Sequence, residues 1–266
     1  MSRISVAAFG PGDDRSAATV ERRAANQVAA AAPCSVVAET PAGRLVGLAI
    51  SRQLGDRLLL AWAAVDPEFQ GRGILRAMLA GWPGPQSGLT RMVVSSTDPA
   101  AMRAYAGLDL QVLPTVSAGG ILRPGAVELP RGVEELSPLE AEGFLGPLGA
   151  SVRGTGWPRH DLEMLEAQGD RVHVVDDGVG RQAAVIRGGA IVRMVAATDE
   201  ASAIRALRAA LASAPPGATV HLNHLRAGMD WAIRTALDAR LVLSPEGPVY
   251  ADGPLSPWHL PSGALG

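Results

Sequence analysis

Two glycines and two arginines lie close together after an apolar segment, and their types and spacing suit the binding of a phosphate group. Gly71 and Gly73 flank Arg72, and Arg76 follows three residues later. Glycine allows a backbone turn to adopt positive φ angles and to approach an anion without interference from a Cβ atom. Arginine adds charge-assisted hydrogen bonds to phosphate oxygens. The pattern predicts a turn that binds a pyrophosphate.

The flanking residues predict the elements that hold this turn. Residues 58–65 are apolar throughout, which is typical of a buried strand, and Asp66 begins a short turn after them. The apolar spacing then becomes helical at Ile74, Met78 and Trp82. We therefore expect a helix whose unpaired N-terminal amide groups, at the positive end of the helix dipole, face the phosphate.

Three phosphate-binding motifs compete for this stretch. A P-loop requires lysine, which the chain lacks, and Arg76 replaces the third glycine of a dinucleotide fingerprint. The third motif is Q/R-x-x-G-x-G/A after a strand that ends in Val-Asp-Pro, the acetyl-CoA signature of the GNAT superfamily of acyl-CoA N-acyltransferases. The sequence resembles it at Gln70 and Gly73, with Leu75 at the final small position. The alternative is a glycine-rich turn that caps an ordinary helix.

A second segment also resembles this superfamily. Residues 89–94 are expected to form a strand, and a helix capped by Thr97 or Asp98 follows them. The helix and its end resemble the pattern N-x-x-A-x-x-x-Y-x-x-x-G-F. The corresponding positions are Asp98, Ala101, Tyr105, Asp109 and Leu110. The resemblance covers residues 45–122.

Tyr105 is the candidate catalytic residue that the resemblance implies. In the superfamily this phenol lies near the sulfur of acetyl-CoA and acts as a general acid. A phenol with an ordinary pKa of about 10 is protonated at neutral pH and can donate to a departing thiolate. The alternative is a tyrosine that only seals a contact between the helix and the sheet, with its hydroxyl at the rim.

The resemblance implies acetyl-CoA as cosubstrate and direct attack by an amine in a ternary complex. The pantetheine arm would lie along the strand that ends at Val65, where this strand separates from residues 89–94. Main-chain groups there would also polarise the thioester carbonyl. The candidate cofactor-binding residues are Ala63, Ala64, Val65, Gln70, Gly71, Arg72, Gly73, Ile74, Leu75, Arg76, Asp98 and Ala101.

Composition limits the class of protein. The 266 residues carry a net charge of −2, which argues against a nucleic-acid partner. The single cysteine, Cys34, excludes an internal disulfide, and no residues have the spacing of a metal site. The sequence has neither an apolar run long enough to span a membrane nor a signal peptide, so we expect a cytoplasmic protein, a monomer or a homodimer.

The chain reads as a tandem repeat of one α/β (α+β) domain with a mixed sheet. The segments AAVD and LRAMLA, within residues 63–80, recur in similar form as VAATD and LRAALA within residues 195–212. We expect two GNAT-like domains, at residues 1–124 and 125–266. The second copy is degenerate, because Asp199 and Glu200 replace the glycine-rich turn and Arg234 stands in the position of Tyr105.

The predicted function is therefore transfer of an acetyl group from acetyl-CoA to a primary amine of a small molecule. The amine must lose a proton before it attacks, and Glu39 or Glu68 acting through water are the candidate bases. The alternative is a non-catalytic module that binds acyl-CoA or another protein. The residues do not identify the acceptor amine.

Overall fold

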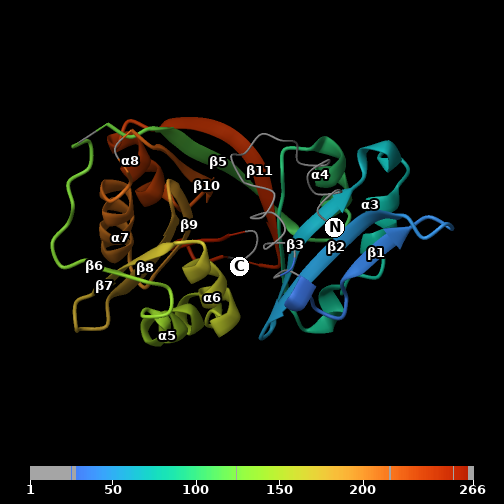
Figure 1. Cartoon of the computed structure of the whole chain (residues 1–266), viewed down its shortest axis with the longest axis horizontal. Coiled ribbons are helices and arrows are strands. Elements are labelled where there is room, and N and C mark those ends of the chain that lie inside the picture. Colours follow the sequence, from blue (N-terminus) through green and yellow to red (C-terminus); the bar gives the residue numbers. More distant parts are fainter. Residues whose placement is uncertain (1–24, 26–27, 124, 216, 254, 263–266) are drawn as a thin grey trace. The chain divides into compact units, whose positions relative to one another are not determined.

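The computed structural model describes residues 25, 28–123, 125–215, 217–253 and 255–262 (Figure 1). They divide into two compact units. The first unit extends to Val112 and also includes Val249–Gly253, and the second comprises Leu113–Pro248 and the segment after Gly253. The first unit therefore takes a short piece of chain from near the C-terminus.

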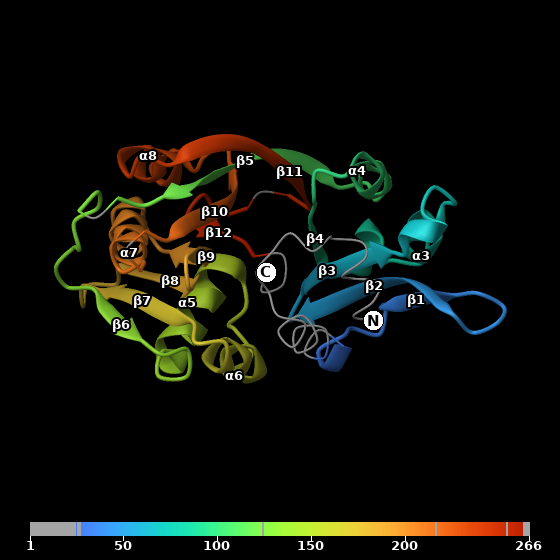
Figure 2. The same cartoon turned by 45° about the horizontal axis from the view of Figure 1, so that its top comes forward.

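The described part of the first unit contains a mixed sheet and the α-helices α3 and α4. Its strands run in the order β1, β2, β3, β4 and the last part of β11, and Figure 2 shows the first four in this order. β3 is antiparallel to β2 and parallel to β4, and β4 is antiparallel to β11. The elements are β1 (Val36–Glu39), β2 (Leu45–Leu54), β3 (Arg57–Val65), η1 (Pro67–Phe69), α3 (Ile74–Leu79), η2 (Pro85–Ser87), β4 (Thr90–Val94), α4 (Pro99–Ala106) and β11 (Val242–Ala251).

Separation of β3 from β4 is the feature of this sheet that matters most for the site. The two strands pair from Arg57 to Leu60, where Leu60 lies opposite Val93. β3 continues to Val65 and is paired there with β2 on its other side. The register of this pairing shifts between Leu60 and Trp62, so Ala61 is the extra residue of a β-bulge. Among the described residues, no strand pairs with the β4 side of β3 beyond Leu60.

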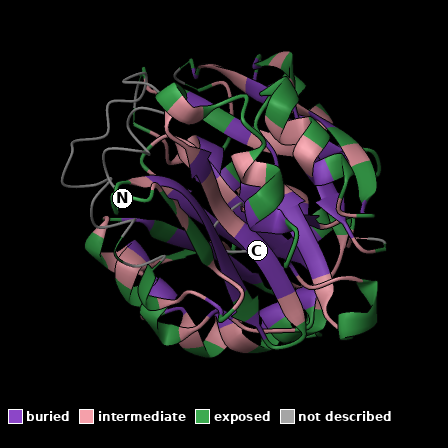
Figure 3. Cartoon of the chain, turned by 90° about the vertical axis from the view of Figure 1, so that its right-hand side faces the viewer, coloured by how far each residue is buried: buried purple, intermediate pink, exposed green. Residues whose placement is uncertain are grey.

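The core of the first unit lies between its sheet and α3 and α4. Leu58, Leu60 and Val93 on the strands pack with Met78 on α3 and Tyr105 on α4, and all five are buried. Burial of such side chains contributes about 1.5–3 kcal/mol each to folding. Figure 3 shows that the strands are mainly buried and that the helices carry most of the exposed residues.

The second unit is also a mixed sheet with helices. Its strands follow the order β5, β10, β9, β8, β7 and β6, and β12 pairs with β9. The elements are β5 (Gln111–Ile121), whose first two residues belong to the first unit, β6 (Glu134–Leu136), α5 (Glu142–Arg153), α6 (Arg159–Ala167), β7 (Arg171–Asp176), β8 (Gln182–Gly188), β9 (Ile191–Ala197), α7 (Glu200–Ala212), β10 (Thr219–Arg226), α8 (Asp230–Asp238) and β12 (His259–Leu260).

The two units share an order of elements. In the first, β3 leads through α3 to the parallel strand β4, and α4 follows. In the second, β9 leads through α7 to the parallel strand β10, and α8 follows. The strands and helices expected from the sequence are present, except that α3 ends at Leu79 and Trp82 lies beyond it, and the mixed α/β sheet is confirmed. Within the described residues, no helix is both long enough and apolar enough to cross a membrane.

Candidate functional site

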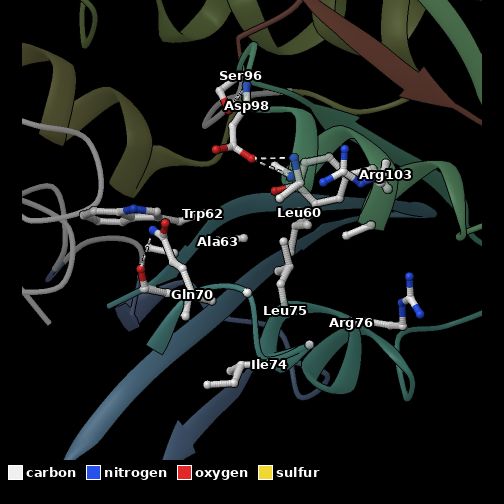
Figure 4. Close-up of a pocket in the computed structure, with 18 of the residues that line it drawn as sticks. Leu60, Trp62, Ala63, Gln70, Ile74, Leu75, Arg76, Ser96, Asp98 and Arg103 are labelled. Carbon is white, nitrogen blue, oxygen red and sulfur yellow. Dashed lines mark hydrogen bonds between the residues drawn. The ribbon is translucent and has the colours of Figure 1, made fainter. Parts of the chain in front are cut away.

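A cleft of about 820 Å³ opens in the first unit, beside the free edge of β3. This volume lies within the usual range for small-molecule sites, about 300–1,000 Å³. The second half of β3, the turn into α3, and the start of α4 form its walls (Figure 4). The predicted site residues that line it are Ala63, Ala64, Val65, Gln70, Gly71, Gly73, Ile74, Leu75, Arg76, Asp98, Ala101 and Tyr105.

The glycine turn has the backbone that the sequence suggests. Gly71 has a φ of 73° and Gly73 has a φ of 77°, and Gly73 is the N-cap of α3. A Cβ atom at either position would meet no atom within 4 Å, so glycine is required for the left-handed backbone and not for packing. The amide groups of Gly71, Arg72 and Gly73 donate no hydrogen bond to any described residue. They are available to an anion.

The arginines around the turn have different surroundings. Arg72 is the one predicted site residue that does not line the cleft, because its Nη2 donates to the Glu68 carbonyl at 3.0 Å and its guanidinium lies 4.9 Å from the centre of the Phe69 ring. Arg76 does line the cleft, as does Arg103 of α4 (Figure 4). Arg103 lies two residues from both Ala101 and Tyr105, a spacing that does not place residues on one face of a helix. The sequence therefore did not indicate that Arg103 lines the cleft.

Gln70 closes the turn between β3 and the glycines. Its Nε2 donates to the Val65 carbonyl at 3.1 Å (Figure 4). Just before it, Asp66 accepts a hydrogen bond from the Glu68 amide at 3.0 Å, which is the main reason why the pKa of Asp66 is lowered. Arg44 bridges Asp66 and Glu68 at 2.8 and 2.7 Å. The turn is therefore held by its own side chains and by Arg44, which precedes β2.

Asp98 fixes the start of α4. Its Oδ1 accepts hydrogen bonds from the amides of Ala100 and Ala101, both at 2.8 Å, and Pro99 follows at the first helical position. This confirms Asp98 as the N-cap, one of the two residues expected there. Among the described residues it is also the only carboxylate that lines the cleft. Neither Glu39 nor Glu68 does so.

Tyr105 has a buried ring and a hydroxyl that makes no hydrogen bond to any described residue. It is 6% exposed, lines the cleft, and makes no hydrogen bond through its hydroxyl to the described part of the chain. Burial raises the pKa of Tyr105 to about 12, with smaller contributions from the charges of Asp98 and Tyr250. The hydroxyl therefore stays protonated at neutral pH and can donate to a ligand.

The corresponding region of the second unit is closed by the chain itself. β9 pairs with β10 only at Ile191 and Val192. Further along, β8 occupies one edge of β9, and β12 pairs with the other edge at Val195 and Ala196. The edge of β9 that corresponds to the open edge of β3 is therefore occupied by β12.

The start of α7 also differs from the glycine turn. Asp199 is its N-cap and accepts hydrogen bonds from Ser202, from the amide at 3.1 Å and from the hydroxyl at 2.8 Å. Glu200 adds a second negative charge in the first turn. Arg234, the residue that the sequence repeat predicts in the position of Tyr105, is exposed. No group of three or more potential metal ligands occurs among the described residues.

No protein-family model matches this sequence, and no curated protein does either. Solved structures do match. A "Putative Acetyltransferase" from Pyrococcus horikoshii has a TM-score of 0.72 at 13% identity, with 100% of this chain and 91% of that chain covered. A GCN5-related N-acetyltransferase from Sphaerobacter thermophilus has a TM-score of 0.56 at 15% identity, with 94% and 90% covered.

A third structure, described as a probable N-acyltransferase from Enterococcus faecalis V583, has a TM-score of 0.55 at 13% identity, with 94% of this chain and 68% of that chain covered. At such identities the similarity concerns the fold. The chain has the fold of the GCN5-related N-acetyltransferases, which is the fold that the Gln70 and Tyr105 motifs predict.

Proposed function

We propose that the first unit binds acetyl-CoA in its cleft and transfers the acetyl group to a primary amine of a small molecule. The observation that carries this proposal is the open edge of β3 beyond Leu60, which ends next to the glycine turn. A strand edge offers unpaired amide and carbonyl groups to the amides of a pantetheine arm. The turn that follows offers three free amide groups to a diphosphate.

Side chains around the cleft support this orientation of the cosubstrate. Ala63 and Ala64 are small and leave room along the strand. Arg76 and Arg103 supply positive charge for the phosphates. In this arrangement the thioester lies near the bulge of β3 at Ala61, and Tyr105 faces it from α4.

The reaction proceeds by direct attack of the amine. The neutral amine forms a C–N bond with the thioester carbonyl carbon, the C–S bond breaks, and the nitrogen loses one proton to water to give the neutral amide. Main-chain amides of β3 stabilise the negative charge on the carbonyl oxygen. The Tyr105 hydroxyl donates a hydrogen bond to the leaving sulfur, which carries the developing thiolate charge. The proton that the ammonium must lose passes to water, since Asp98, the only carboxylate among the described residues that line the cleft, caps α4.

The second unit is, in this proposal, a degenerate copy of the first, and the boundary of the two repeats lies near residue 124. The shared order of elements supports the duplication. β12 on the edge of β9 and the acidic cap at Asp199 argue that this copy binds no acyl-CoA. The chain then holds one acetyl-CoA.

A non-catalytic acyl-CoA-binding module is the competing function. This function is favoured because the described residues that line the cleft include no carboxylate other than Asp98, which caps α4. Release of free thiol from acetyl-CoA, measured with a panel of primary amines at several pH values, distinguishes the two. Amine-dependent thiol release supports the transferase. Tight binding of acetyl-CoA without thiol release from any amine supports the binding module.

A further inference from the structure

Tyr250, which lies 145 positions beyond Tyr105 in the sequence, belongs to the same core. It is on the part of β11 that completes the sheet of the first unit. There Val249, Tyr250 and Ala251 pair with Val94, Val93 and Met92 of β4, respectively. Tyr250 is 2% exposed. A residue from the end of the chain thus lies behind the candidate catalytic residue.

Tyr250 contacts α4 in two ways. Its hydroxyl donates a hydrogen bond to the Met102 carbonyl at 2.9 Å, one helical turn before Tyr105. Its ring also meets the Tyr105 ring edge to face, with 5.9 Å between ring centres and an interplanar angle of 69°. Since the Tyr105 hydroxyl has no hydrogen bond to the described residues, ring contacts of this kind decide where that hydroxyl points.

The strand that carries Tyr250 is anchored next to it. Asp252 accepts three hydrogen bonds from Arg91 of β4, from the backbone amide at 2.9 Å, from Nε at 2.8 Å and from Nη2 at 3.0 Å. Arg91 is 2% exposed and also donates to the Leu108 carbonyl, just after α4, at 3.0 Å. The anchor therefore ties β11 to both β4 and the end of α4.

We propose that Tyr250 is a positioning residue for Tyr105. It holds α4 by its hydroxyl and the Tyr105 ring by its own ring, so that the Tyr105 hydroxyl faces the sulfur of the acyl donor. This inference rests on the proposed function. A core tyrosine that contributes only stability is the alternative, and the two make different predictions.

The kinetic test is a double-mutant cycle with Tyr250→Leu, Tyr105→Phe and the pair. Loss of an edge-to-face ring contact corresponds to about a 2- to 10-fold effect, so we expect Tyr250→Leu to lower kcat by that factor. The KM for acetyl-CoA should stay within about 2-fold, since Tyr250 is not among the residues that line the cleft. In the Tyr105→Phe background, Tyr250→Leu should have no further effect on kcat. Equal effects in the two backgrounds would overturn the proposal.

Two further variants separate positioning from stability. Tyr250→Phe keeps the ring and loses the hydrogen bond to Met102, so it should lower kcat less than Tyr250→Leu does. Val249→Ala changes a buried residue of the same strand whose side chain points to the opposite face of the sheet from Tyr250, so it should lower stability and leave kcat unchanged. If Val249→Ala lowers kcat as much as Tyr250→Leu, the effect is one of stability and the proposal is wrong.

A spectroscopic readout does not depend on turnover. The chain has two tyrosines, so in the Tyr250 variants any signal of isotope-labelled tyrosine in an NMR spectrum belongs to Tyr105. One sharp Tyr105 ring signal is expected in Tyr250→Phe, and a broadened or split signal in Tyr250→Leu, because the ring then exchanges between rotamers. An unchanged signal in Tyr250→Leu would overturn the proposal. Should no amine support turnover, the proposed function fails, and this spectrum alone decides whether Tyr250 orders Tyr105.

Discussion

Replacement of Tyr105 by phenylalanine tests the chemistry assigned to the cleft. The ring is buried and phenylalanine keeps its packing, while the lost hydroxyl has no hydrogen bond to the described residues. The free energy of unfolding should therefore change by less than about 0.5 kcal/mol. Acetyl-CoA affinity should also be nearly unchanged, because the hydroxyl acts on the charge that develops as the sulfur leaves.

The expected loss of turnover follows from the acidity of the phenol. A thiol has a pKa of about 8.5, so complete proton transfer from Tyr105, with a pKa of about 12, is uphill by roughly 3.5 units. We therefore expect Tyr105 to stabilise the thiolate mainly by a hydrogen bond, worth about 2–3 kcal/mol, which corresponds to roughly a 30- to 150-fold decrease in kcat. This is near the low end for general acid catalysis.

The assay is thiol release at saturating acetyl-CoA and the best amine, with thermal unfolding and acetyl-CoA titration of the same variant as controls. Full turnover in Tyr105→Phe would refute the catalytic assignment and leave Tyr105 as a packing residue. Loss of acetyl-CoA binding, with the fold intact, would refute it differently, since the hydroxyl would then be a ligand anchor.

Three other predictions concern charge. Arg76→Gln and Arg103→Gln should each weaken acetyl-CoA binding by about 10-fold in calorimetric titration, with less effect at high salt, because each removes one charge from an exposed phosphate site. Asp252→Asn should lower the free energy of unfolding by about 3 kcal/mol in denaturant titration, since it leaves the buried guanidinium of Arg91 without its carboxylate. Arg91 holds the pKa of Asp252 below its usual value, so this stabilisation is present above about pH 4 and is lost as the pH falls. In pH–rate measurements, kcat/KM should rise with the fraction of neutral amine and show no falling limb from Tyr105 below about pH 11, because its raised pKa keeps the phenol protonated.

Local signals in the sequence predicted those features of the candidate site whose geometry depends on residues close together in the chain. The two glycines predicted left-handed backbone, and both have positive φ. Asp98 before Pro99 predicted a capped helix start, and the carboxylate accepts two amide hydrogen bonds there. The apolar run at residues 58–65 predicted the strand that borders the cleft, because a short continuous apolar run is a local signal of a buried strand.

Pairing between distant segments could not be predicted in this way. Nothing near Tyr250 indicates that its strand pairs with β4, because strand partners depend on the whole topology and not on local composition. The same limit applies to β12, which fills the edge of β9. Long flexible side chains were a second limit. Spacing placed the Arg72 side chain in the site, whereas a nearby carbonyl and an aromatic ring hold its guanidinium outside the lining of the cleft, and Arg103 lines the cleft.

Binding of acetyl-CoA at the glycine turn is the central claim, and one calorimetric titration series tests it most directly. It compares the unmodified chain with Gly73→Asp and with a matched control, Gly43→Asp. Gly43 has a φ of 78° and, like Gly73, open space around it, but it does not line the cleft. Both substitutions thus impose the same backbone strain and add the same charge.

We predict one acetyl-CoA per chain, the same affinity in Gly43→Asp, and no measurable binding in Gly73→Asp, because a carboxylate at the turn repels the diphosphate. Two equivalent sites per chain, or unchanged affinity in Gly73→Asp, would contradict the account.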